Sequence, residues 1–197
     1  MKRLTIVTAI IFAGVGTGYA FTDGGSRRFS EFLSGLKEAP AIVSTTGTGT
    51  FRATINRDET AIDYVLTFKN LESDARQAHI HIGYPQNAGN IVLWLCDSAA
   101  APLPTSPVAS TPLCSQSDPN DLKSGRVTGT LTEADVIAQT ANGIAGPADF
   151  AEVVALIREG RTYVNVHTAN IGAGEIRSQI DNSDQNSGDH AHGHEDR

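Results

Sequence analysis

The amino-acid sequence predicts an all-β, mostly antiparallel domain, either a sandwich or a barrel, with a short helical insertion at about residues 132–159. Several short runs of alternating apolar and polar residues predict strands, and many of the nineteen glycines fall in the turns between these runs. Only one segment carries a helical apolar stripe. The 197-residue chain is 40% hydrophobic, which is enough to bury a core and excludes wholesale disorder.

The first twenty residues have the parts of a secretory signal peptide. Lys2 and Arg3 form the charged region, residues 4–15 form the apolar region, and Gly18 and Ala20 place small residues at the −3 and −1 positions of a cleavage site. The apolar run is shorter than the ~20 residues that a spanning helix needs, although an uncleaved anchor is an alternative. We therefore expect a signal peptide at 1–20, a linker at 21–29, a secreted or periplasmic location and no transmembrane segment after signal removal.

Residues 50–70 predict a β-hairpin. In its second half Ile62, Tyr64, Leu66 and Phe68 share one face, and mostly polar residues lie between them. Residues 51–55 alternate in the same way, and a polar connection at 57–59 separates the two runs. By the same criteria further strands are expected at 77–82, 90–95, 125–131, 162–167 and 174–180.

The helical insertion contains two short helices. Thr132 is a suitable N-cap with Asp135 three residues later, and Pro147 starts a second helix, where its missing N–H costs nothing. Gly160 is a natural C-terminal stop. The second helix has an apolar stripe made of Phe150, Val153, Val154 and Ile157.

Cys96 and Cys114 are the two cysteines of the chain. In an oxidising compartment an even number of cysteines predicts a disulfide, which here would pin an Ala-, Pro-, Ser- and Thr-rich loop. Two independent thiols are the alternative. A zinc pair is disfavoured because the spacing matches no zinc pattern.

Composition and motifs exclude several function classes. The net charge of −7 and the lack of a basic run argue against a nucleic-acid partner. The sequence has no nucleophile elbow, and the glycines at 47 and 49 precede a strand rather than a helix, so they do not indicate a nucleotide site. No pair of carboxylates can be singled out as acid and base. Glu175 and Arg177 alternate on one strand face, which predicts a surface ion pair of little energetic weight.

Three histidines fall in predicted strands. His79 and His81 are two residues apart, so their side chains share one strand face, while Ala78 and Ile80 face the other way. His167 lies on the polar face of another strand. Three imidazoles plus a water form a sensible open site for copper or zinc, and a solvated strand face is the alternative.

Three segments, in order along the chain, carry a family likeness. They are LSGLKEAP at 33–40, AHIHIG at 78–83, and YVNVHT at 163–168 followed by GEIR at 174–177. These segments resemble the motifs of the CHRD domain, a module named for chordin that also occurs in microbial exported proteins. The resemblance implies a CHRD domain at 30–181, with an immunoglobulin-like or Greek-key β-sandwich or barrel fold and a poorly defined molecular function. The chain departs from the family at Ser178, usually a glycine, and in the insertion between the cysteines. The motif positions that carry over are His79, His81, His167, Glu175 and Arg177.

Three functions are compatible with these features. The first is a non-enzymatic, exported binding or structural module whose partner is an unknown extracellular protein or a metal ion held by His79, His81 and His167. The second is a copper enzyme, because the His-x-His strand is similar to one in copper–zinc superoxide dismutases. The third is a periplasmic metal carrier or buffer. The sequence leaves enzymatic activity undecided, although it offers no catalytic residue.

The tail at 182–197 is expected to be disordered, because its only apolar residue is an alanine. His190, His192 and His194 alternate with small residues and are flanked by carboxylates, which predicts a second, weak metal site. A solvated acidic tail without metal affinity is the alternative.

Calorimetric titration of Cu²⁺ or Zn²⁺ should therefore reveal one extra weak site in the full chain that a version ending at Asp181 lacks. This site should disappear at about pH 5, because protonated imidazole cannot bind metal. Equal stoichiometry in the two chains would contradict the tail site.

Overall fold

The computed structural model describes residues 26–98 and 106–181. The expected signal peptide, most of the expected linker, and the histidine tail lie outside the described residues.

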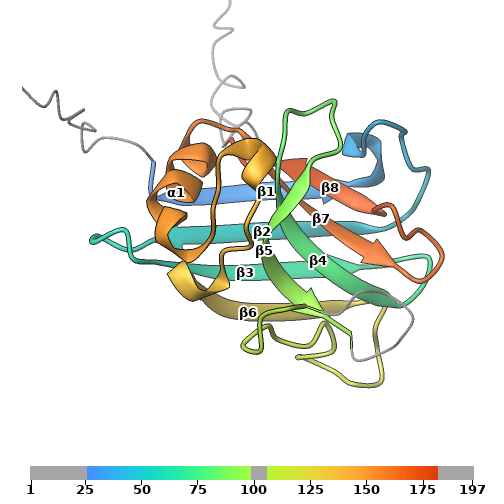
Figure 1. Cartoon of the computed structure of the whole chain (residues 1–197). Helices are drawn as coiled ribbons and strands as arrows, with labels where there is room; N and C mark the ends of the chain where they lie inside the picture. Colours follow the sequence, from blue (N-terminus) through green and yellow to red (C-terminus); the bar gives the residue numbers. More distant parts are fainter. Residues whose placement is uncertain (1–25, 99–105, 182–197) are drawn as a thin grey trace, which may run out of the picture.

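Eight antiparallel strands form one sheet that curves into a nearly closed barrel, as Figure 1 shows. The strand order is β5-β4-β7-β8-β1-β2-β3-β6. The predicted all-β antiparallel fold is confirmed, and of the two expected architectures the molecule has the barrel. The elements are β1 (Arg28–Ser34), β2 (Thr48–Ile55), β3 (Ala61–Lys69), β4 (Ala75–Ile82), β5 (Asn90–Asp97), β6 (Gly125–Thr132), α1 (Phe150–Arg158), β7 (Thr162–Thr168) and β8 (Ile176–Gln179).

The seam between β1 and β8 is the weakest pairing in the sheet. The register joins these two strands at Ser34 and Arg177 alone, whereas β1 pairs with β2 along its whole length. On its other side β8 pairs with β7 over four positions. β8 is thus held mainly by β7.

The hairpin predicted at 50–70 is present as β2 and β3, with the expected alternation of buried and exposed residues. Alternation did not reveal β1. Phe29 and Leu33 point into the core, but the inward position between them is Glu31, which is 2% exposed, and the outward Phe32 is 47% exposed. Because a carboxylate is buried and an aromatic ring is exposed, β1 lacks the alternation of apolar and polar residues that predicts a strand.

The helices of the insertion start and stop at the predicted residues, but the first of them is shorter than expected. Asp135 accepts hydrogen bonds from the backbone N–H and the hydroxyl of Thr132, but this first helix is a single 3-10 turn. Another 3-10 turn starts at Pro147 and leads into α1, and Gly160 follows the helix with φ of +64°. The predicted apolar stripe of α1 is buried in the barrel core.

The predicted disulfide between Cys96 and Cys114 is present, with both residues buried and their Cα atoms 4.9 Å apart. The backbone N–H of Cys114 donates to the carbonyl of Asp97, and the N–H of Asp97 donates to the carbonyl of Pro112. The bridge therefore fastens the end of the insertion against β5. Within the described residues, every helix is too short or too polar to cross a membrane.

Tyr64 links β3 to β5 through the barrel interior. Its hydroxyl donates a 2.6 Å hydrogen bond to the carbonyl of Leu95. Gly129 on β6 pairs directly with Tyr64, and a Cβ at this glycine would lie 2.6 Å from the tyrosine oxygen. The glycine makes room for the ring, and the ring is held in place by its hydrogen bond.

We expect Gly129→Ala to lower the free energy of unfolding by about 1–3 kcal/mol, because the new methyl group meets a ring that cannot move without losing its hydrogen bond. Denaturant unfolding measures this change. In a double-mutant cycle, Tyr64→Phe removes the nearest clashing atom and frees the ring from its hydrogen bond so that it can shift, so Gly129→Ala should cost less in the Tyr64→Phe background. Additive costs would contradict the proposed contact.

Candidate metal centre

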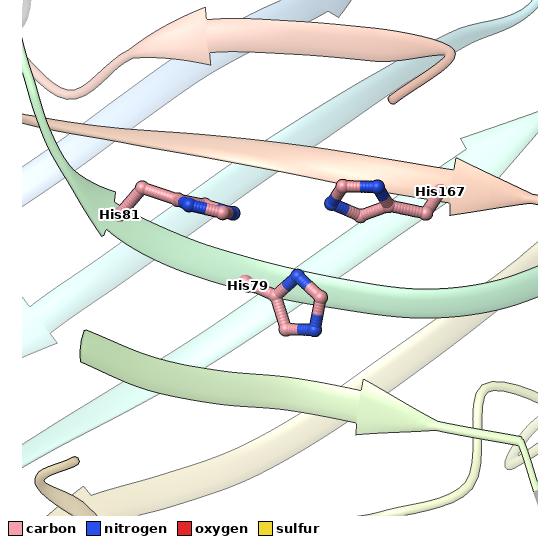
Figure 2. Close-up of side chains that lie close together, drawn as sticks. All are labelled: His79, His81 and His167. Atoms are coloured by element: carbon pink, nitrogen blue, oxygen red, sulfur yellow. The ribbon is translucent and has the colours of Figure 1, made fainter. Parts of the chain in front are cut away.

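The antiparallel pairing of β4 with β7 gathers the three strand histidines. His79 lies opposite Asn165 and His81 lies opposite Tyr163, so side chains at 79, 81 and 167 share the outer face of the barrel wall. Figure 2 shows one ring nitrogen of each histidine pointing toward the other two rings. One ligand atom from each of His79, His81 and His167 lies within 4.8 Å of the others.

The three rings are buried, with exposed fractions of 1% for His79, 6% for His81 and 9% for His167. The solvated strand face that sequence analysis left as an alternative is therefore wrong. Aromatic rings account for part of this burial. Trp94 on β5 packs edge-on against His79 at a centroid distance of 4.2 Å, and Tyr163 stacks on His81 at 4.7 Å.

Two of the rings are oriented by backbone carbonyls. Nδ1 of His81 lies 2.9 Å from the carbonyl oxygen of Gly89, and Nδ1 of His167 lies 3.0 Å from that of Gly172. Each neutral ring that donates from Nδ1 presents the lone pair of Nε2 to the cluster. Outer hydrogen bonds of this kind commonly fix the tautomer of metal-binding histidines.

His79 makes no such bond. Neither its Nδ1 nor its Nε2 has a hydrogen-bond partner among the described residues, and the Nε2 of His81 has none either. Leaving a buried polar atom unsatisfied costs about 1–3 kcal/mol. A metal ion would satisfy these nitrogens, so the donor set fits such an ion.

Among the residues that the structure describes, Asn165 is the side chain that occupies a ligand position. Its Oδ1 lies 2.9 Å from Nε2 of His167, while Gly172 faces Nδ1 of the same ring. A neutral imidazole cannot donate to two acceptors at once. Metal binding through Nε2 of His167 therefore requires the Asn165 amide to turn away from that nitrogen.

Burial keeps the cluster neutral. Desolvation lowers the pKa of His79 well below its ordinary value, lowers that of His81 to about 4 and also lowers that of His167. Neutral imidazole is the form that binds metal. Ligand bonds of about 2.0–2.1 Å would bring the nitrogens to about 3.5 Å from one another, closer than in the present arrangement.

The predicted surface ion pair of Glu175 and Arg177 is wrong, because both residues are fully buried, at 0% and 1% exposure. Glu175 accepts hydrogen bonds from the hydroxyls of Thr45 and Thr168 and from the backbone N–H of Glu72. These bonds tie together loops at one end of the barrel. Alternation along a strand predicts that its polar face meets water. Both faces of this strand are covered, so the prediction of a surface pair failed.

Arg177 instead lies beside the histidine cluster. Its guanidinium carbon sits 3.4 Å from the centre of the Tyr163 ring, and its Nη2 donates to the carbonyl of Tyr84. Sequence reasoning did not identify Trp94, Tyr163, Asn165 or Arg177 as neighbours of the cluster. Two of these residues, Tyr163 and Asn165, could have been identified because they share a strand face with His167.

A comparison with protein-family models matches residues 29–180 to the CHRD domain. Comparisons with curated proteins and with solved structures find no match.

The lowered histidine pKa values predict that the metal-free protein loses stability as pH falls from 7 to 5. In this window histidines of the unfolded chain, with pKa near 6.5, take up protons, but the folded cluster does not. His81, with a pKa of about 4, contributes about 2 kcal/mol of this loss, and the other two add with the same sign. Denaturant unfolding at each pH measures the effect.

Glu38 has the opposite influence, because burial raises its pKa to about 7 and the folded protein takes up its proton first. The measurement is therefore made in a Glu38→Gln variant, where the histidine effect stands alone. Constant stability between pH 7 and 5 in that variant would contradict a neutral buried cluster.

Proposed function

Because the chain belongs to the CHRD-domain family, we propose that it is an extracytoplasmic barrel module that binds one metal ion, copper or zinc, through His79, His81 and His167. The role is to bind the metal rather than to turn over a substrate. The disulfide supports a location outside the cytoplasm, since such bonds persist in oxidising compartments.

His79 carries the proposal. It is 1% exposed, both of its ring nitrogens lack a partner among the described residues, and it lies between the two other histidines. A histidine kept only for packing would have a hydrogen bond to at least one nitrogen, as buried polar groups usually do. A phenylalanine would fill the same place without the desolvation penalty.

Burial also favours binding over catalysis. A catalytic metal needs an open coordination position that substrate can reach, whereas the three ligands here are at most 9% exposed. Trp94 and Tyr163, which pack on two of the ligands, are themselves 6% and 3% exposed. An ion at this site would be shielded from solvent.

His79→Phe should abolish binding at the cluster and raise the free energy of unfolding of the metal-free protein by about 1 kcal/mol or more, because two unsatisfied nitrogens are removed. The measurements are metal content after dialysis, the fluorescence of Trp94, and denaturant unfolding. Trp94 is the single tryptophan of the chain and touches His79, so bound Cu²⁺ should quench it.

Both chains in this comparison carry alanine at 190, 192 and 194, which removes the tail histidines. Arg158→Met, which breaks a distant ion pair with Glu59, is the matched control and should bind metal normally. Retained binding in His79→Phe would refute the proposed centre. A loss of stability without any metal bound to the parent chain would point instead to a packing role.

A further inference from the structure

Resting on the proposed metal centre, we infer that the cluster selects monovalent copper, and that Arg177 sets this preference from its position over the Tyr163 ring, which stacks on His81. The charge of the ion that the site accepts depends on the ligand charges, on the burial of the site and on the cation behind it.

The ligand set is neutral. Among the described residues no cysteine, aspartate or glutamate joins the three histidines in the cluster. The cost of burying an ion grows with the square of its charge, so a divalent ion costs about four times as much as a monovalent one before ligands compensate. Three neutral imidazoles bring no negative charge to the site, so the uncompensated charge is smaller for Cu⁺ than for Cu²⁺ or Zn²⁺.

The number of donors points the same way. Zinc sites are almost always four-coordinate, with a fourth protein ligand or a water. Here the histidines supply three nitrogens, the Asn165 amide has to turn away from His167 for a metal to bind, and the ring of Trp94 packs against His79. Monovalent copper accepts three imidazoles in a plane without a fourth ligand, and imidazole is a suitable ligand for copper.

Arg177 adds a fixed positive charge behind the site. The His81 ring stacks on Tyr163 with an interplanar angle of 4°, and the guanidinium covers the Tyr163 ring. Arg177 is 1% exposed, so solvent screens its charge poorly. A cation so placed repels a divalent ion more strongly than a monovalent one and favours the reduced metal.

The other charged groups near Arg177 do not cancel its positive charge. Lys37, another cation, donates to Ser178 next to Arg177. Glu38 is the acidic partner of Arg177, but burial raises its pKa to about 7, so it carries only part of a negative charge at neutral pH. Glu38 is therefore an incomplete counter-ion for Arg177.

The test is a competition titration of the full chain, with alanine at 190, 192 and 194, against chelators for Cu⁺ under ascorbate and for Cu²⁺ and Zn²⁺ in air. We expect one equivalent of Cu⁺ to be bound more tightly than either divalent ion. Arg177→Met removes the charge at similar length and should reduce the Cu⁺ preference over Cu²⁺ by about tenfold. For a one-electron couple this equals a fall of about 59 mV in reduction potential.

Arg177→Lys retains the charge and should keep most of the preference, and Arg158→Met should leave it unchanged. The parent titration needs no substitution, so it decides the question even where an Arg177 variant does not fold. Equal or tighter binding of Cu²⁺ or Zn²⁺ overturns this inference and leaves the proposed centre standing. Absence of any bound metal overturns the proposed function itself. An unchanged preference in a folded Arg177→Met variant removes Arg177 from the explanation.

Discussion

The antiparallel register between β4 and β7 determines what the outer wall of this barrel can do. Pairing His79 with Asn165 places three imidazoles, an amide and a tyrosine on one patch, although the strands lie more than eighty residues apart in sequence. A slip of one residue in either strand would send its polar side chains into the apolar interior. The interior side chains of the same strands, among them Ile80, Val164 and Val166, thus fix the register on which the cluster depends.

Much of this arrangement could be predicted from the sequence. Alternation located both strands of the hairpin, and the spacing of His79 and His81 placed both rings on one face. The cysteine pair and the caps of the helical insertion were also predictable, because each is a local chemical signal. These elements depend on neighbours in the chain, which a single sequence displays directly.

The burial of the outer face could not be predicted. Period-two reasoning assumes that a polar face meets water, but here loops and aromatic rings cover it, and Glu175 and Arg177 are as buried as any core residue. β1 escaped notice for a different reason, since the charged Glu31 occupies an inward position. The contact between Trp94 and His79 depends on the pairing of β4 with β5, which residue spacing does not encode. The molecule has two buried layers, an apolar one inside the barrel and a polar, aromatic one outside it.

Because β8 is attached mainly on one side, the response of the barrel to force depends on where the force is applied. A load applied at the C-terminal end reaches Ile180 first, whose N–H donates to Thr162, and then β8, which is joined to β1 at one position and to β7 at four. Peeling this strand would separate it from β7 pair by pair while most of the remaining wall stays paired. Arg177 would leave the face of Tyr163 when the third of these four pairs separates, since it lies on the peeling strand and the tyrosine does not. Tension on the C-terminal end would thus reach the surroundings of the histidines as β8, the strand that joins β7 to β1, is lost from the wall.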